Sequence, residues 1–270
     1  MRTSLRFPIL FLVICTVVLV ALAEPLKAST LDRAESAYGA GRYDEAAQLY
    51  LERAMDKAQN SANASLYHNL GLAFDRQKEL GLAVAAYLRA VQLEPRQGDF
   101  QYNLKFLLDQ AQDKLEPDFP RDVLNFVWEG PGRFLSEREV FYATVGLLVL
   151  TSLLLGLALV LPKLRKGALV FALLSALGLI SSGSALSFKI WGQPDLGAVA
   201  VKTLNAYSGP TESIVIFELH LGAPFQILNT SGDWVKISLS DQKQGWVKKE
   251  GIASFGKDSV ILPAHVDIKS

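Results

Sequence analysis

The stretch SLYHNLGLAFDRQKELGLAVAAYLRAVQLEP, residues 65–95, decides the fold of the N-terminal half of this chain. Apolar residues recur at helical spacing in two runs, one around Leu70 and one around Tyr87, and Leu80-Gly81 separates the runs. Pro95 ends the second run, because proline cannot continue a helix. The stretch therefore predicts a pair of packed helices.

This helical hairpin resembles a tetratricopeptide repeat, a unit of about 34 residues. The match rests on Tyr67, Leu70, Gly71, Phe74, Ala83, Tyr87, Ala90 and Pro95. An earlier unit, AESAYGAGRYDEAAQLYLERA (34–54), carries a similar pattern, and DFQYNLKFLLDQAQDKL (99–115) predicts a capping helix. We therefore expect a tetratricopeptide repeat domain with its capping helix over residues 29–116.

The resemblance to tetratricopeptide repeats implies a concave face that binds partner proteins. The residues implied there are His68, Asn69, Leu72, Asp75 and Arg76. Asn69 matches a position that grips a peptide carboxylate, but Leu31 stands where the companion lysine is expected. A solvated helix face is the alternative interpretation for all five residues.

Two uncharged runs, residues 140–161 and 168–188, follow a Pro- and Gly-rich connector at 117–139. Each run is close to the roughly 20 residues that a helix needs to cross a bilayer. Both are apolar on all sides, which favours transmembrane helices over a hairpin buried in a soluble core. The small residues of the second run predict a helix-packing face. The connector either follows the membrane surface or packs under the repeat domain.

The loop between the two runs, residues 162–167, carries Lys163, Arg165 and Lys166 and no acidic residue. Positive charge favours the cytoplasmic side of a membrane, so we expect this loop in the cytoplasm. Trp128 and Trp191 would then lie near the outer interface of the membrane. Both soluble regions are predicted on the extracytoplasmic side.

The N-terminus has the three parts of a secretory signal peptide: basic residues, an apolar core and the ending Ala21-Leu22-Ala23. Cleavage after Ala23 is expected, and an uncleaved anchor is the alternative. The single cysteine, Cys15, lies inside this segment, so the cleaved chain would have neither disulfides nor a thiol nucleophile.

Short strands separated by Gly, Pro, Ser and Asp are predicted over residues 196–256. In WVKISLS (234–240), Val235 and Ile237 alternate with Lys236, as in a half-buried strand. The region resembles a bacterial SH3 domain through LNAYSGPT (204–211), Leu221-Gly222, GDWVKI (232–237) and GWV (245–247). No clear pattern marks the tail, residues 257–270.

The resemblance to bacterial SH3 domains implies a surface that binds cell-wall peptides or proteins. Three aromatic residues are candidates for that surface: Tyr207, Trp234 and Trp246. Arginine is common in the family at the position of Tyr207. For the two tryptophans, a place in the barrel core is the favoured interpretation, because aromatic side chains in small barrels usually serve packing.

Composition and motifs favour a non-enzymatic protein. The formal net charge of +0 argues against nucleic-acid binding. The sequence contains no metal-protease, CxxC, dinucleotide or phosphate-loop motif, and its three histidines lie outside the uncharged runs. We therefore expect no catalytic residues, no metal and no cofactor.

The order of these parts predicts a multi-domain α plus β membrane protein with tetratricopeptide α-hairpins, a two-helix transmembrane hairpin and a small SH3-like β-barrel. That order resembles the BatE family of the Bacteroides aerotolerance system. The resemblance implies a scaffold in the bacterial inner membrane that acts in oxidative or envelope stress tolerance. Its implied partners are von Willebrand A-domain membrane proteins, a BatD-like protein and, indirectly, a MoxR-type ATPase. A cell-wall sensor whose barrel binds peptidoglycan is the alternative.

Overall fold

The computed structural model describes residues 29–56, 63–115, 135–257 and 259–266. The chain divides into two compact units: one includes residues 126–191, and the other combines residues 28–125 with residues 192–270. The predicted signal peptide (1–23) with Cys15, and residues 117–134 of the predicted connector with Trp128, lie outside the described residues. The described residues contain helices and an antiparallel sheet, as the α plus β prediction requires.

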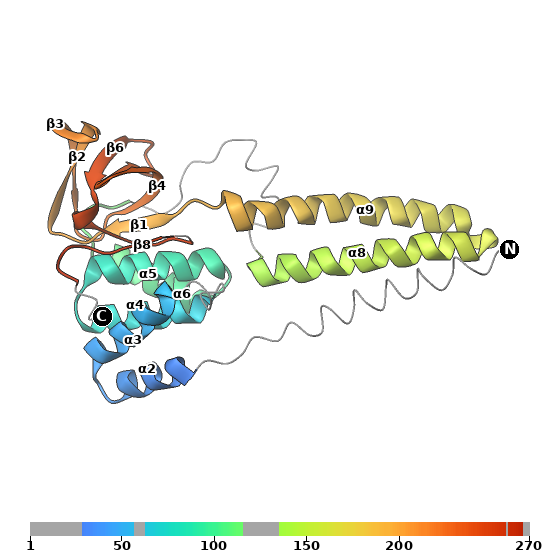
Figure 1. Ribbon diagram of the computed structural model, residues 1–270, viewed down its shortest axis with the longest axis horizontal. Helices are drawn as coiled ribbons and strands as arrows, with labels where there is room; N and C mark the ends of the chain where they lie inside the picture. The colour runs from blue at the N-terminus through green and yellow to red at the C-terminus, as the bar shows by residue number, and fades with distance from the viewer. Residues whose placement is uncertain (1–28, 57–62, 116–134, 258, 267–270) are drawn as a thin grey trace. The chain divides into compact units, whose positions relative to one another are not determined.

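Successive helices pack side by side in the N-terminal part of the second unit (Figure 1). They are α2 (Ser29–Gly39), α3 (Tyr43–Met55), α4 (Ala64–Arg76), α5 (Leu80–Leu93) and α6 (Gly98–Leu108). The helical hairpin predicted from residues 65–95 is α4 with α5, and the capping helix α6 ends earlier than the predicted residue 115. Tetratricopeptide character itself stays a prediction.

The turn between α4 and α5 differs from the predicted Leu80-Gly81 break. The helix α4 ends at Arg76, and Lys78 adopts a left-handed conformation with a φ of 64°. The backbone N–H of Glu79 donates to the carbonyl oxygen of Phe74 at 2.9 Å, which closes the end of α4. Leu80 and Gly81 are therefore the first residues of α5.

Close packing of α4 on α5 depends on Gly71. A Cβ atom at position 71 would lie 2.9 Å from Cε1 of Tyr87, closer than side-chain atoms pack. Tyr87 is almost fully buried, so its ring has little room to move away. The glycine thus lets the ring of Tyr87 lie against the backbone of α4.

Residues 196–261 form an eight-stranded antiparallel sheet in the order β3-β2-β6-β5-β4-β1-β7-β8. The strands are β1 (Leu196–Val199), β2 (Thr203–Gly209), β3 (Thr211–His220), β4 (Pro224–Ser231), β5 (Trp234–Ser238), β6 (Gln244–Lys248), β7 (Ile252–Phe255) and β8 (Val260–Ile261). The sheet curves into a barrel (Figure 1). Its core includes Phe225, Val235, Ile237, Val247 and Ile252, all fully buried.

The helices and the barrel share one hydrophobic core. The helix α5 packs against β1 and β7, and Ala198, Ala253 and Phe255 belong to the same buried cluster as the helical side chains. The ring of Phe255 lies 6.0 Å from that of Tyr67. A Cβ atom at Gly81 would lie 2.2 Å from the carbonyl oxygen of Val199, so only glycine permits this approach of α5 to the barrel. We call the contact of α5 with β1 and β7 the α5–barrel junction.

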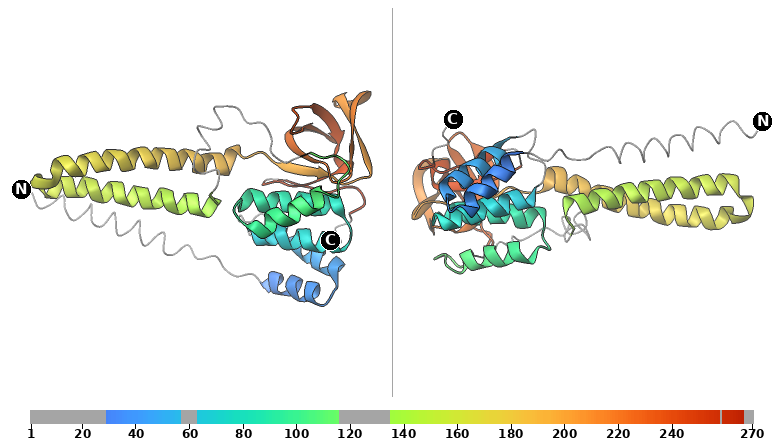
Figure 2. Two further views of the ribbon diagram at one scale, coloured as in Figure 1. Left: turned by 180° about the vertical axis from the view of Figure 1, so that it is seen from behind. Right: turned by 90° about the horizontal axis from the view of Figure 1, so that it is seen from below.

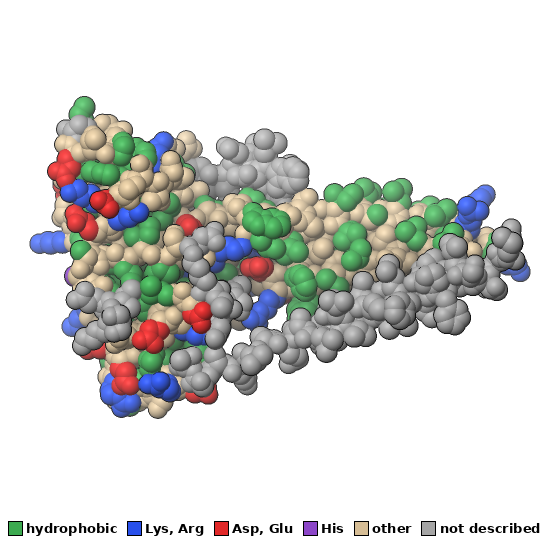
Figure 3. Space-filling view, in the orientation of Figure 1, with side chains coloured by type: hydrophobic (Ala, Val, Ile, Leu, Met, Phe, Trp, Pro, Cys, Tyr) green, Lys and Arg blue, Asp and Glu red, His purple; other side chains and the backbone are tan. Residues whose placement is uncertain are grey.

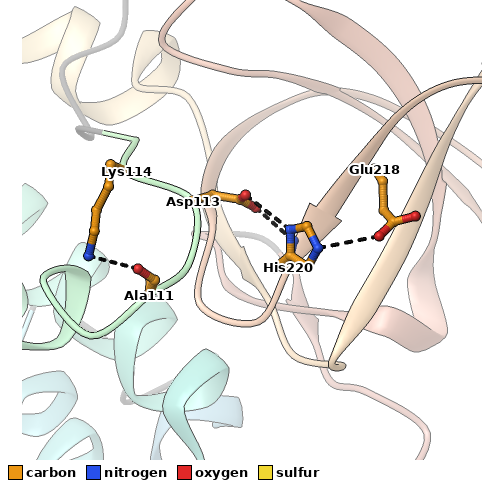
Figure 4. A network of polar contacts seen from close by, with 5 residues as sticks. All are labelled: Ala111, Asp113, Lys114, Glu218 and His220. Atoms are coloured by element: carbon orange, nitrogen blue, oxygen red, sulfur yellow. Dashed lines mark hydrogen bonds and ion pairs between the residues drawn. The ribbon is translucent and has the colours of Figure 1, made fainter.

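Hydrogen bonds also link the helical part to the barrel. After α6, the carboxylate of Asp113 accepts a hydrogen bond from the backbone N–H of His220 at 2.7 Å and lies 3.0 Å from Nδ1 of the same residue (Figure 4). The other ring nitrogen of His220 lies 3.3 Å from Glu218. Nε2 of Gln92 donates to the carbonyl oxygen of Pro194 at 2.7 Å. The barrel and the helices therefore behave as one body.

The first unit contains the long antiparallel helices α8 (Glu137–Val160) and α9 (Arg165–Ser187), joined by the short helix η2 (Pro162–Leu164) and followed by η3 (Phe188–Gly192) (Figure 2). Both long helices are long and apolar enough to cross a membrane by length and composition. Small residues line their contact: Ala158, Ala168, Ala172, Ser175 and Ala185 are buried. The packing face predicted for the second run thus includes buried small residues, whereas its serines at 181, 182, 184 and 187 are not buried.

The end of the helical pair is tighter than the predicted loop 162–167. Arg165 and Lys166 already belong to the first turn of α9, and Lys163 lies in η2. All three side chains are exposed. At the other end, the capping box of Ser136 and Glu139 fixes the start of α8, and Trp191 is exposed after α9.

Candidate functional site

The strongest candidate site lies on the outside of the barrel, where Tyr207, Trp234 and Trp246 come together. These residues come from β2, β5 and β6, which are neighbours in the sheet. Side chains of a strand alternate between its two faces, and the buried Val235 and Val247 occupy the inner one. The three half-buried aromatic side chains therefore share the outer face, which we call the aromatic face.

Pairing between the strands fixes the geometry of the aromatic face. Tyr207 lies directly opposite Trp246, and Lys236 lies opposite Trp246 on the other side. The rings of Tyr207 and Trp234 meet edge to face, with centroids 5.4 Å apart. Nζ of Lys248 lies 5.9 Å from the centre of the Trp234 ring. Ring contacts of this kind hold the aromatic side chains in a defined arrangement.

A shallow depression of about 470 Å³ adjoins the aromatic face, lined by residues that include Tyr207, Glu212, Lys248, Glu250 and His265. Lys248 forms an ion pair with Glu212 and lies 3.8 Å from Glu250. The hydrogen bond to Glu212 raises the pKa of Lys248 above its usual value. The depression thus offers both a positive and a negative group beside flat rings, a combination suited to polar ligands with a stacking surface.

The core interpretation of the two tryptophans is wrong. Neither Trp234 nor Trp246 belongs to the buried cluster inside the barrel. The alternation in WVKISLS already contained the signal, because Trp234 must share a face with Lys236 if Val235 and Ile237 face inward. The charged partners Glu212, Lys248 and Glu250 are residues that sequence analysis missed, since they meet only through strand pairing.

His68 and Asn69, predicted on a concave binding face, contact neighbouring helices. The half-buried ring of His68 stacks on Phe100 of α6 at 4.5 Å, and its Nε2 lies 3.0 Å from Nδ2 of Asn103. Burial lowers the pKa of His68 below its usual value. Asn69 is hydrogen-bonded to His68 and to Tyr50, and burial raises the pKa of Tyr50 to about 12. Both predicted residues thus help to hold the helices together.

The other predicted residues of this face also have internal contacts. Leu72 packs against the helical core. Nε of Arg76 donates to the hydroxyl of Tyr38 at 3.5 Å, and its guanidinium lies 6.0 Å from the centre of the Tyr43 ring. Asp75 is half-buried beside Arg76 and Tyr87. These residues lie along α4, but the contacts do not bring them together around a shared pocket.

Within the described part of the chain, no three His, Cys, Asp or Glu side chains lie in an arrangement that could hold a metal ion. The network of Asp113, His220 and Glu218 does not converge, because the two carboxylates bind opposite nitrogens of one ring. We therefore assign this network to the connection between helices and barrel.

The barrel is similar to a known family of domains. No curated protein and no solved structure matches the chain. The family model of the bacterial SH3 domain matches residues 200–253, which include β2 to β6, the aromatic face and the first half of β7. Residues 200–253 of this chain are therefore similar to a bacterial SH3 domain.

Proposed function

We propose that this chain is a non-enzymatic, membrane-anchored scaffold whose bacterial SH3 domain binds a partner through the aromatic face. A bacterial SH3 domain is a module for protein interaction or peptidoglycan binding. The aromatic face carries the proposal, because half-buried aromatic side chains held in a defined arrangement are enriched among the residues that dominate binding energy at interfaces. The α5–barrel junction supports a scaffold, since it presents the helices and the barrel together.

The surface of α8 and α9 supports the membrane anchor. Hydrophobic side chains lie along the visible length of this helical pair, with backbone and other side chains between them, and Lys and Arg gather at one end (Figure 3). Large side chains such as Leu153, Phe171 and Leu173 are more than half exposed. In water such a surface would be a strong aggregation site, whereas lipid tails cover it at no cost.

In detail, we propose a BatE-type protein of the bacterial inner membrane, with both soluble parts on the extracytoplasmic side. The order of helical repeats, membrane hairpin and SH3 domain supports this assignment. Its partners would be von Willebrand A-domain membrane proteins and a BatD-like protein, with a MoxR-type ATPase reached indirectly. Oxidative or envelope stress tolerance would be the process served.

Peptidoglycan binding by the aromatic face is the second candidate function. Flat indole rings next to charged groups suit a ligand with sugar rings and a peptide, and the family match supports it. The two candidates are separated by a Trp234→Ala, Trp246→Ala variant of the full chain in detergent. The scaffold proposal predicts that protein partners co-purify with the native chain and are lost in the variant. Native binding to purified peptidoglycan without protein partners would favour the sensor.

Membrane topology is tested with single cysteines in a Cys15→Ser background. Ser208 and Lys166 are both exposed, one in β2 and one at the start of α9. The proposal predicts that an impermeant thiol reagent labels Ser208→Cys but not Lys166→Cys in spheroplasts. Both should label after the membrane is opened with detergent. Labelling of Lys166→Cys alone in intact spheroplasts would reverse the topology.

A further inference from the structure

The strand β3 forms one end of the sheet. One of its edges pairs with β2, and no strand among the described residues pairs with the other edge. At its C-terminal end, the backbone N–H of His220 donates to the carboxylate of Asp113 at 2.7 Å. Successive N–H groups of a strand point to alternate edges, so the N–H of Glu218 points to the same side. We call the unpaired edge of β3 between Glu212 and Glu218 the β3 edge.

Three consecutive β-branched residues on the β3 edge are exposed to solvent. The exposed fractions are 63% for Ile214, 50% for Val215 and 47% for Ile216. Natural edge strands usually carry lysine or proline at such positions, because exposed apolar edges attract other strands. The register shift opposite Ala206 and Tyr207 leaves Ile216 in a bulge. The bulge shortens the straight part of the strand, which suits one short peptide better than a growing sheet.

Both ends of this apolar triplet carry net negative charge. At the N-terminal end, Lys248 contacts Glu212 and Glu250, so one positive charge faces two negative ones. At the C-terminal end, the carboxylates of Asp113 and Glu218 flank the ring of His220, while Nζ of the neighbouring Lys114 donates to backbone carbonyl oxygens instead (Figure 4). Acidic side chains and hydrophobic ones also lie close together on the visible surface of the barrel (Figure 3).

The charge pattern disfavours pairing of β3 with β3 of a second copy. A two-fold antiparallel pair centred on Val215 would place Glu212 of each copy opposite Glu218 of the other. Like charges directly opposite each other destabilise a strand pair, whereas opposite charges stabilise it. The surface therefore fits a strand that brings basic residues to both ends.

We propose that the β3 edge binds an extended peptide of another protein by strand addition. The peptide has apolar residues at alternate positions, which pack beside Val215 on the outer face of the sheet, and a lysine or arginine near each end, which meets Glu212 or Glu218. Main-chain hydrogen bonds supply affinity in this mode, and the basic residues supply direction and specificity. The β3 edge lies beside the aromatic face. Strand addition at this edge needs no ligand on the aromatic face, so the proposal does not rest on the function proposed above.

The test uses the full chain in detergent micelles and two fluorescent peptides of alternating valine and threonine. One peptide has lysine at both ends and the other has glutamate. The lysine peptide should bind at least about tenfold more tightly, by fluorescence anisotropy, because two opposite-charge pairs replace two like-charge pairs. Its binding should slow amide hydrogen exchange in residues 212–218.

Charge reversal provides the matched variants. Glu218→Lys should weaken the lysine peptide by about tenfold and improve the glutamate peptide. Asp233→Lys makes the same charge change in the exposed turn between β4 and β5 and should alter neither affinity. Equal binding of both peptides, binding of neither, or exchange protection outside β3 would overturn the proposal. So would a dimer protected at 212–218, since a second copy would then occupy the edge.

Discussion

The helices α5 and α9 are both apolar on nearly all sides, yet their surroundings differ completely. Ten residues of α5, from Gly81 to Leu93, are buried, between α4 and α6 on one side and the barrel on the other. In α9 only four residues are buried, against α8, and most large side chains are exposed. Neighbouring helices and the barrel therefore bury α5, whereas α9 needs another apolar surface around it.

Length separates the two cases. A helix rises about 1.5 Å per residue, so α5 with 14 residues spans about 21 Å, which is short of the roughly 30 Å core of a bilayer. The 23 residues of α9 span about 35 Å, which is enough to cross it. An apolar helix too short for a membrane must find several protein faces to pack on, and here β1 and β7 of the barrel supply one of them.

The largest expected effect tests the cover of α9. Leu173 is 63% exposed near the middle of α9, and Tyr102 is 69% exposed on α6. In lipid, arginine near the centre of a span costs about 2.5–3.5 kcal/mol, so Leu173→Arg should reduce the membrane-inserted fraction in a translocation assay. Tyr102→Arg should leave insertion unchanged. Equal insertion of both variants would mean that α9 does not face lipid.

The next effect tests the α5–barrel junction. Gly81→Ala places a Cβ atom against the backbone of Val199 and Ala200, and such overpacking costs about 1–3 kcal/mol. Helix propensity alone predicts the opposite sign, a gain of about 0.5–1 kcal/mol. Gly98→Ala, at the start of α6, has open space around it and is the control. Urea unfolding followed by circular dichroism gives the sign, and a stabilised Gly81→Ala would refute the junction.

The sequence correctly predicted the helices and strands that depend on the local spacing of apolar residues. The helical spacing around Leu70 and Tyr87 and the alternation of Val235 and Ile237 are set by neighbouring residues, and the structure contains the corresponding helices and strand. The predicted role of Gly81 as a break between two helices is wrong. A glycine at the start of a helix looks like a turn signal in the sequence. In the structure, Gly81 instead permits close contact with β1, which lies more than a hundred residues later in the chain. Contacts between segments so far apart in the chain produce no periodic pattern in the sequence.

The candidate site shows the same division. The sequence alone indicates the three aromatic residues of the aromatic face as a candidate binding surface. Their mutual contact, and the approach of Lys248 to Trp234, depend on the pairing of β2, β5 and β6, which a single sequence does not reveal. In the helical part, the sequence predicted His68 on a binding face. Its ring instead stacks on Phe100 of another helix, and a single sequence does not reveal such a contact.

A smaller effect concerns the contact between α8 and α9. Oγ1 of Thr151 and Oγ of Ser175 lie 2.8 Å apart across the two helices. Hydrogen bonds between membrane helices contribute about 0.6 kcal/mol on average, so Thr151→Val should weaken the helical pair by about that amount. Oγ of Ser152 donates to the carbonyl oxygen of Leu148 within its own helix, and Ser152→Ala is the control. Reversible unfolding in mixed micelles measures both, and equal effects would deny the interhelical bond any contribution.

The smallest expected effect concerns the packing of α4 and α6 against α5. The ring of His68 lies 5.6 Å from that of Tyr87 on α5 and stacks on Phe100. Because burial lowers the pKa of His68 in the folded chain, protonation favours the unfolded chain. This contribution to stability is complete well above the unfolded pKa of about 6.5 and is lost as the pH falls from that value through the lower pKa of the folded chain.

His68→Gln isolates that contribution, because the amide keeps a polar group opposite Asn103 and cannot titrate in this range. The difference in unfolding free energy between the native chain and the variant should change between pH 7.5 and pH 5.5, with the native chain losing more stability on acidification. His265→Gln, which removes an exposed histidine beside Glu79, is the matched control. Comparing the variants cancels the contributions of all groups that are present in every chain. An identical pH dependence of the unfolding free energy for the native chain and His68→Gln would show that the charge of the His68 ring does not affect the packing around α5.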